Sequence, residues 1–310
     1  MVKKEKYKYF DNLFKWVTFS GIIIVLLIVS GIFISLVFES KEAISKFGVF
    51  KFLFTKTWDP VAEIFGSATM LTGTVVVTVL ALIFAIPVAI GIAIFIVELC
   101  PPFLKGAFGT TIEMLASIPS IIYGMWGLFT IAPIMGNYIE PFLQKYLSPI
   151  PIVGKLFSGT PLGIDILTAS MVLSIMLIPF IASITRDTLN LTPQVLKESA
   201  YGMGATKWEV IRDVMLPHSK FGIYGSIVIA LGRALGETMA VAFVLGNNHK
   251  IPSSLFDAAA TITVTLANEF TEADSDLYLS SLFYLALILF ISSFVILAFA
   301  KYMLRRASEK

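Results

Sequence analysis

The chain has 310 residues, of which 57% are hydrophobic and only 14% are charged, and its formal net charge is +2. A soluble domain carries roughly 25% charged residues and about 45–50% apolar ones, so this composition excludes an ordinary water-soluble fold. The single cysteine, Cys100, excludes an internal disulfide, and neither His218 nor His249 has a ligand-spaced neighbour that would suggest a metal site.

Six stretches are long and apolar enough to cross a hydrocarbon core about 30 Å thick, which takes ~20 helical residues. They are residues 16–38, 68–97, 107–131, 164–185, 221–246 and 277–302. The basic segment before the first stretch is not that of a cleavable signal, because the apolar run is too long and no small-residue cleavage pattern follows it. We therefore expect an all-α, multi-pass membrane protein with about six transmembrane helices.

Lysine and arginine counts in the connecting segments predict the orientation. With the N-terminus inside, the inner segments carry about twice as many of these residues as the outer ones, which predicts that both termini are cytoplasmic. In the outer segment 42–65, aromatic residues spaced among charges suggest a helix that lies at the membrane interface.

The one sizeable inner connection is the loop 186–220. Its sequence predicts two short helices joined by an elbow, from the helix start, break and stop signals at Thr192, Pro193, Gly204, Thr206, Glu209 and Pro217. On these residues alone, an amphipathic connector that rests on the membrane surface explains the loop equally well.

The fifth stretch carries two charges, Arg233 and Glu237. A charge at the centre of a membrane helix costs ~2.5–3.5 kcal/mol on insertion scales, so it predicts a functional site. The two residues are four apart, which on a continuous helix puts them on one face within pairing reach. Either the pair neutralises itself and only fixes packing, or Arg233 presents its planar guanidinium to an oxyanion while Glu237 holds it in one state.

The inner loop contains E-S-A, three residues, G, nine residues and V-M-L-P over positions 198–217. This pattern resembles the EAA loop of ABC importer permeases, with Ser199 in place of Ala and Val214 in place of Ile. The resemblance implies that the loop is a coupling-helix region that docks in a groove on a separate nucleotide-binding subunit. The residues it implies for this role are Glu198, Ser199, Ala200, Gly204, Leu216 and Pro217.

Two further runs, RALGETMAVAFVLGN at 233–247 and ASIPSIIYG at 116–124, resemble the phosphate-specific importer permeases. The stretch LANEF with the following EA, at 266–273, is similar to the PstC-type rather than the PstA-type member. The resemblance implies import of inorganic phosphate, along a path that we expect to include Arg233, Glu237, Thr238, Ser117 and Ser120. The two serines have an alternative, because membrane serines commonly hydrogen-bond back to helix carbonyls.

The resemblance also implies a type I ABC importer permease (MetI-like) fold. We expect residues 1–15 to form a cytoplasmic tail and residues 16–67 to hold the first span with an extracytoplasmic segment. Residues 68–303 form the permease domain with the loop 186–220, and 304–310 form a second cytoplasmic tail.

The chain has no GxxxxGK[ST] loop, so we expect a non-catalytic subunit that binds no cofactor, with ATP and Mg²⁺ on partner ATPase subunits. The other implied partners are a PstA-type permease subunit, an extracytoplasmic phosphate-binding protein, phosphate and membrane lipid, with no nucleic acid, in the cell (inner or plasma) membrane. The alternatives are a permease for sulfate, molybdate or phosphonate, a phosphate-sensing subunit, an anion channel, or a membrane hydrolase, for which we find neither a nucleophile nor a metal cluster.

Overall fold

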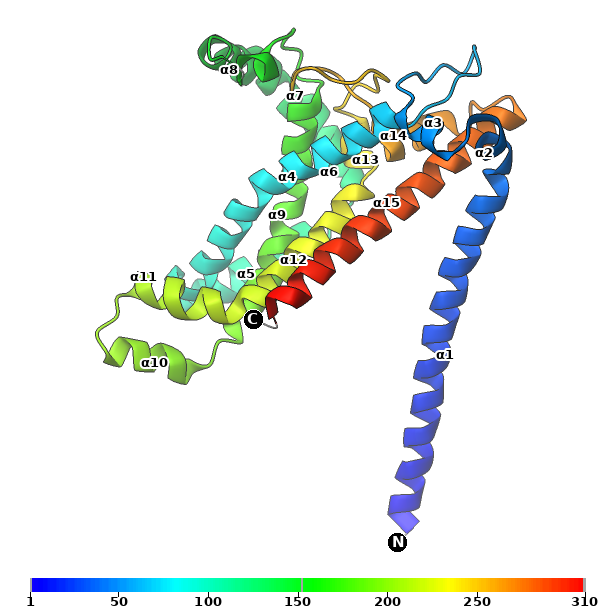
Figure 1. The fold of residues 1–310 in the computed structure, drawn as a ribbon. Coiled ribbons are helices and arrows are strands. Elements are labelled where there is room, and N and C mark those ends of the chain that lie inside the picture. The colour runs from blue at the N-terminus through cyan, green and yellow to red at the C-terminus, as the bar shows by residue number, and fades with distance from the viewer. Residues whose placement is uncertain (1, 152, 309–310) are drawn as a thin grey trace.

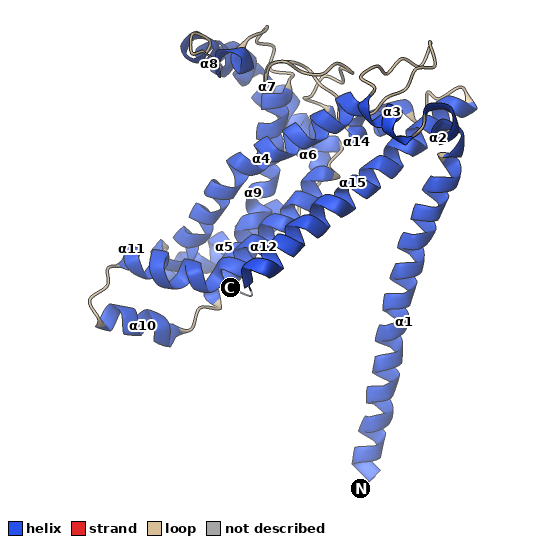
Figure 2. Ribbon diagram, in the orientation of Figure 1, coloured by secondary structure: helices blue, strands red, loops and turns tan. Residues whose placement is uncertain are grey.

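The computed structural model describes residues 2–151 and 153–308, and over these ranges the regular elements are all helices (Figure 2). Isolated β-bridges join loop residues, Asp59 to Ile64 and Gly246 to Ala259. The all-α class predicted from the sequence is therefore confirmed.

Five helices of the described residues are long and apolar enough to cross a membrane. They are α1 (Val2–Glu39), α4 (Ala68–Ile94) with its π-helical extension η1 (Phe95–Leu99), α9 (Ile166–Asn190), α12 (Leu216–Leu235) and α15 (Asp276–Ser308).

The third predicted span, 107–131, is wrong as a single straight helix. The helix α5 (Pro102–Ala116) stops before Pro119, and the helical run that starts with α6 (Ser120–Trp126) leaves at an angle of 88° to it. Proline has no N–H to donate, and its ring disfavours the α conformation in the residue before it, so the helix ends there. Counted as one bent crossing, the pair raises the number of spans to the predicted six.

The fifth predicted span, 221–246, is also interrupted. The helix α12 ends at Leu235 with Gly236 as its C-cap, and α13 (Met239–Ala242) is a separate short helix. Glycine loses more conformational freedom in a helix than any other residue, which favours a helix end at this point. The prediction of one continuous helix through Glu237 is therefore wrong.

The remaining helices gather at the two ends of the bundle (Figure 1). The end that carries α10 and α11 is called the inner end here, because the sequence predicts that it is cytoplasmic, and the opposite end is called the outer end. The inner end holds α10 (Gln194–Gly202), α11 (Lys207–Glu209) and η5 (Val210–Met215). The outer end holds α2 (Lys41–Phe47), α3 (Val49–Phe54), η2 (Gly127–Ile131), α7 (Ala132–Ile134), η3 (Met135–Ile139), α8 (Glu140–Leu147), η4 (Val153–Phe157), α13 and α14 (Ile262–Glu269).

The core lies where α4, α9 and α12 pack together, and α9 is the most buried of the spans. Lipid tails are as apolar as leucine, so helices associate in a membrane through close packing, which small residues permit. The stripe of α4 that faces α9 has alanine at every fourth position, Ala81, Ala85 and Ala89, and all three are fully buried. This spacing lets the two backbones pack closely beside the helix breaks.

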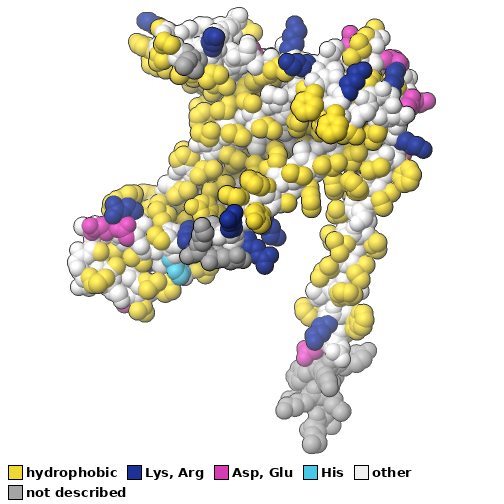
Figure 3. All heavy atoms as spheres, in the orientation of Figure 1, with side chains coloured by type: hydrophobic (Ala, Val, Ile, Leu, Met, Phe, Trp, Pro, Cys, Tyr) yellow, Lys and Arg dark blue, Asp and Glu magenta, His cyan; other side chains and the backbone are white. Residues whose placement is uncertain are grey.

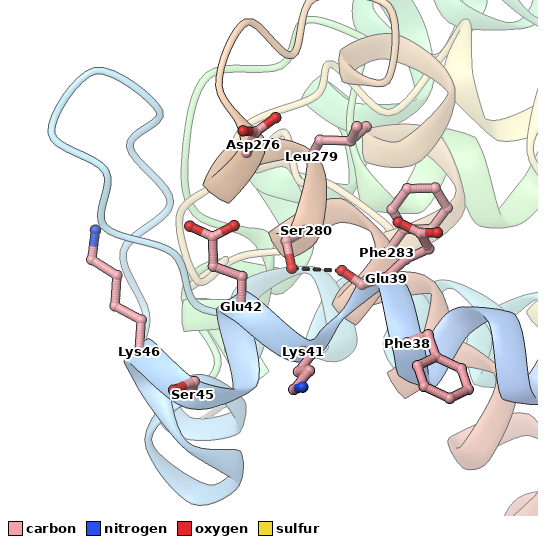
Figure 4. A pocket seen from close by; sticks show the side chains of 10 residues that line it. All are labelled: Phe38, Glu39, Lys41, Glu42, Ser45, Lys46, Asp276, Leu279, Ser280 and Phe283. Carbon is pink, nitrogen blue, oxygen red and sulfur yellow. Dashed lines mark hydrogen bonds between the residues drawn. The ribbon is translucent and has the colours of Figure 1, made fainter.

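The first helix is attached differently. It packs against α15 and α2 at its outer end, while its lower part stands apart from the other helices (Figure 1). At the attachment, the Ser280 hydroxyl donates to the Glu39 carbonyl at 2.7 Å and accepts from the Ala43 N–H at 3.2 Å, beside a cavity of about 670 Å³ (Figure 4). Helix α1 is therefore fixed to the bundle at its outer end.

The side chains are sorted along the bundle as a bilayer requires. Hydrophobic side chains cover the middle of the face in Figure 3, and lysines and arginines lie toward its two ends. The helices α2 and α3 confirm that segment 42–65 is partly helical. The structure does not describe the side chains of four lysines in the N-terminal basic segment, Lys3, Lys4, Lys6 and Lys8. Positions 309–310 of the C-terminal tail lie outside the described residues.

Candidate functional site

Both runs that suggested a transport path fall on helix breaks. The first break separates α5 from α6 at residues 117–119, and the second separates α12 from α13 at residues 236–238. Non-helical backbone at membrane depth is tolerated only where protein buries it or where it lines a polar cavity. In transporters, discontinuous helices of this kind commonly form substrate sites. The two breaks are therefore the first place to look for the site.

Packing between α6 and α13 brings the two breaks close together. A Cβ on Gly124 of α6 would lie 2.6 Å from the Met239 carbonyl oxygen and 3.1 Å from the Cα of Ala240, so only glycine permits this approach. The hydroxyl of Tyr123 donates to the Leu115 carbonyl at 2.9 Å, across the first break. The ASIPSIIYG run and the RALGET run are more than a hundred residues apart in sequence. They nevertheless lie close together in the fold.

Arg233, next to the second break, is a charged residue without an ion-pair partner among the described residues. Its Nε atom is buried and makes no hydrogen bond within residues 2–151 and 153–308, and none of the ion pairs there includes it. Its guanidinium lies 5.7 Å from the ring centroid of Phe180 on α9, which gives a cation–π contact. Charge-assisted hydrogen bonds are worth about 1.5–3 kcal/mol each, so a half-buried guanidinium whose buried Nε has no acceptor favours an anion.

Glu237 does not pair with Arg233, contrary to the sequence prediction. Its Oε1 accepts from the Ala240 N–H at 3.2 Å, and its carbonyl accepts from the Thr263 hydroxyl at 2.7 Å. The reason is the end of α12 at Leu235, which removes the four-residue spacing on one helix face. The carboxylate therefore supports the start of α13 and leaves the guanidinium without its predicted counter-ion.

The three hydroxyl residues of the predicted path are held differently. The Ser117 hydroxyl donates back to the Glu113 carbonyl at 2.9 Å, which is the alternative considered from the sequence. Thr238 has only a long contact, 3.5 Å, with the Gly236 carbonyl. Ser120 begins α6 and is half-buried, and its hydroxyl makes no hydrogen bond in the described part of the chain. Of the two serines, Ser120 therefore has the hydroxyl that is free to contact an anion.

The inner loop has the predicted helix–elbow–helix form. Gly204 has a φ of +89°, a left-handed conformation that favours glycine, between α10 and α11. The Thr206 hydroxyl accepts from the Glu209 N–H, and the Glu209 carboxylate accepts from the Thr206 N–H at 2.7 Å, so the predicted capping box is confirmed.

Two details of this loop differ from prediction. The Thr192 hydroxyl contacts the Ser219 hydroxyl at 3.3 Å and does not cap α10. Pro217 does not end the second helix, because the chain continues without a break from α11 through η5 into α12. The wider π-helical turn of η5 comes just before the proline, and a proline is tolerated where the turn before it is not a regular α-turn.

The coupling residues named from the sequence are divided between the two faces of the loop. Ala200 is buried among Ala93, Val97 and Val210, which joins α10 to the inner end of α4 and η1. Glu198, Ser199, Gly204 and Pro217 are exposed, and Leu216 is half-buried.

An apolar surface lies on the same loop. Val195 is 70% exposed, Met203 is 84% exposed and Trp208 is 59% exposed. Contiguous exposed apolar surface rimmed by polar residues marks sites of protein association, and these three side chains belong to one short segment of 14 residues, 195–208. The ion pair of Lys197 with Glu98, at 2.7 Å, holds α10 against η1.

A buried network at the outer end was missed from the sequence. The Glu269 carboxylate accepts from Trp58 Nε1 at 2.6 Å and from the Tyr278 hydroxyl at 2.7 Å, and it pairs with His249 at 2.8 Å. Burial raises the pKa of Glu269, but the hydrogen bonds from His249, Tyr278 and Trp58 together outweigh it and lower the pKa below its usual value. The network ties the outer segments that carry Trp58 and His249 to α15.

The fold is shared with solved ABC transporters. The chain is similar to the structure of a bacterial ABC transporter involved in the import of the acidic polysaccharide alginate, with a TM-score of 0.58 and 17% identity over 94% of this chain and 96% of that one. It is also similar to an inward-facing conformation of the MetNI methionine ABC transporter, with a TM-score of 0.57 and 18% identity over 81% of this chain and 99% of that one. The MetI-like fold class is confirmed.

The family model of binding-protein-dependent transport system inner membrane components matches residues 64–309. The phosphate transport system permease protein PstC of Mesorhizobium japonicum is 51% identical, over 97% of this chain and 91% of that protein. The protein of the same name in Pasteurella multocida is 48% identical over 97% and 93%, and the probable one of Methanocaldococcus jannaschii is 34% identical over 96% and 94%. The chain therefore belongs to the family of binding-protein-dependent transport system inner membrane components and, within it, to the PstC-type permeases.

Proposed function

We propose that the chain is a membrane permease subunit of an ATP-driven importer of inorganic phosphate. The observation that carries this proposal is the identity of 44–51% with phosphate transport system permease proteins from several bacteria, over nearly the whole chain. Similarity of this extent includes the two helix breaks and the inner loop, and not only the membrane-spanning pattern.

The geometry supports an oxyanion as the transported species. Arg233 is a half-buried, permanently charged donor beside a helix break, and its buried Nε has no acceptor among the described residues. Its planar fork suits phosphate geometrically, and Ser120 and Thr238 lie on the two helix breaks where their hydroxyls would add donors. The hydrogen bond that Glu237 accepts from the Ala240 N–H then shapes the break rather than neutralising the cation.

The inner loop supports the proposal that a separate subunit hydrolyses ATP. Because the chain lacks a phosphate-binding GxxxxGK[ST] loop, ATP with Mg²⁺ would bind a dimer of ATPase subunits. The exposed apolar side chains of α10 and α11 would dock into those subunits, and Gly204 would permit close approach at the elbow. A PstA-type permease would complete the path, an extracytoplasmic phosphate-binding protein would deliver the anion, and both termini would be cytoplasmic in the cell membrane.

The substrate is tested by uptake in cells that lack other phosphate importers and carry the complete transporter with this chain. We expect uptake of ³²P-phosphate that depends on the chain and resists competition by excess sulfate or molybdate. Uptake of ³⁵S-sulfate of the same size, or abolition of phosphate uptake by sulfate, would assign the permease to a different oxyanion.

A further inference from the structure

A second polar cavity lies at the inner end of the bundle, away from Arg233. It has a volume of about 320 Å³ and opens between η1, α5 and α9. Its polar wall is formed by Lys105, Thr110 and Glu113 of α5 and by Arg186 and Asn190 of α9. Neither the coupling residues nor the residues of the proposed transport path lie in it.

Arg186 is held firmly but retains a free donor. Its Nη2 donates to Glu113 at 2.6 Å and to Asp187 at 2.7 Å, and its Nε donates to Asp187 at 3.0 Å. Its Nη1 lies against Gly109, where a Cβ would overlap it, and donates to no acceptor in the described ranges. The side chain is only 14% exposed, so the two carboxylates fix the guanidinium and direct its unused edge along the cavity wall.

Three more donors line the same cavity. Lys105 gives one of its three N–H groups to the Val97 carbonyl, which leaves two for a ligand. The Thr110 hydroxyl and the Asn190 amide make no side-chain hydrogen bond within the described residues. Guanidinium, ammonium, hydroxyl and amide groups thus converge on one space from two helices, while the only carboxylate in its wall is that of Glu113, which already accepts from Arg186.

We propose that this cavity binds a phosphoryl group at the inner face of the membrane. A phosphoryl group has at least two anionic or partly anionic oxygens, which match a fixed guanidinium edge and a mobile ammonium better than a carboxylate or an apolar ligand does. The group is presented by an anionic lipid of the inner leaflet or by inorganic phosphate from the inner aqueous phase, and the chemistry of recognition is the same. The ligand would brace α5, which leads to the first helix break, against the end of α9 that leads to α10.

The test uses the full-length chain in phosphatidylcholine nanodiscs. One arm measures binding of ³²P-labelled inorganic phosphate in an Arg233→Gln background, so that the proposed transport path does not contribute. The other arm measures retention of phosphatidic acid against phosphatidylcholine by native mass spectrometry. The variants are Lys105→Met, Thr110→Val and Glu113→Gln, with Lys220→Met as the control for a lysine at the same end but outside the cavity.

In at least one arm we expect Lys105→Met and Thr110→Val to weaken binding, the lysine change by about tenfold, which corresponds to ~1.4 kcal/mol. Glu113→Gln should strengthen it in the same arm, because a negative charge leaves the wall while a hydrogen-bond partner for Arg186 remains. A response to phosphatidic acid alone assigns the lipid headgroup, and a response to inorganic phosphate alone assigns the free anion. Equal binding of both probes by wild type, Lys105→Met and Glu113→Gln would overturn the proposal, and so would the absence of binding in both arms.

Discussion

Arg186 at the inner end of α9 and Arg233 on α12 differ in how their charges are met. Arg186 donates to two carboxylates, whereas Arg233 has the face of Phe180 beside it and no ion-pair partner among the described residues. A central membrane charge costs ~2.5–3.5 kcal/mol on insertion scales, and a cation–π contact at a half-buried side chain offsets about 0.5–2 kcal/mol of this. The remaining cost is what a bound anion would remove, so an unpaired Arg233 is a better anion site than the neutralised pair expected from the sequence.

Glu269 gives a prediction about pH at the scale of one residue. Its pKa is lower in the folded protein than its usual value of about 4.3. A lowered pKa contributes stability above the unfolded value and loses it as the pH falls through the folded value. We therefore expect the thermal midpoint to fall as the pH is lowered below about 4.3, and we expect Glu269→Gln to lose this part of the pH dependence.

The measurement is a thermal-unfolding series in one detergent across this pH range. The matched control is Glu272→Gln, which changes an exposed carboxylate three residues further along the chain and should keep the wild-type dependence. If Glu269→Gln and wild type respond identically to acid, the buried network does not contribute as argued.

At the scale of elements, close packing of α4 predicts the effects of two glycine changes. A Cβ on Gly73 would overlap the Ala260 carbonyl oxygen, whereas one on Gly91 of the same helix meets nothing within 4 Å. Gly73→Ala should therefore destabilise the protein by about 1–3 kcal/mol, the usual cost of overpacking. Gly91→Ala should be neutral or stabilising, because it removes backbone entropy from the unfolded chain. Equal thermal midpoints for the two variants in detergent would contradict this packing.

The elbow of the inner loop gives a second prediction for an element. Valine at position 204 would have to adopt a φ of +89°, and left-handed backbone costs roughly 1–2 kcal/mol for such residues. We expect Gly204→Val to displace α10 relative to α11 and to reduce recovery of the ATPase subunits in a pull-down. Gly202→Val is the control, because position 202 has open space and no left-handed φ. Full recovery of the ATPase subunits with Gly204→Val would argue against a coupling role for the elbow.

The sequence predicted the elements whose signals are local. The length of the apolar runs and the Thr206–Glu209 capping box depend on neighbours in sequence, and both appear as expected. The breaks in spans three and five were missed although Pro119 and Gly236 were visible, since apolar runs alone do not show whether a membrane helix bends or stops. The network around Glu269 was missed for another reason: Trp58 reaches it across 211 residues, and such pairing leaves no local pattern.

At the scale of the whole molecule, the inner loop, α12 and the second helix break follow one another in an order that suits coupled transport. The two helix breaks lie beside the closely packed α4–α9 pair, and α12 runs without interruption from the inner loop to the second break. Movement of α10 and α11 by a docked ATPase subunit would therefore be transmitted along α12 to the segment that holds Arg233. The match to the family model begins at residue 64, so α1, which stands apart in Figure 1, lies outside the part of the chain that this model covers.

The central claim is that Arg233 binds the transported anion. The most direct measurement is ³²P-phosphate uptake by cells in which Arg233→Gln, Arg233→Lys or Arg306→Gln replaces wild type, with the amount of permease in the membrane measured in parallel. Loss of charge-assisted hydrogen bonds worth about 1.5–3 kcal/mol predicts at least a roughly tenfold fall in uptake for Arg233→Gln. Arg233→Lys should be intermediate because it keeps the charge without the planar fork, and Arg306→Gln, on an exposed side chain, should match wild type. Wild-type uptake by Arg233→Gln at equal membrane abundance would contradict the account.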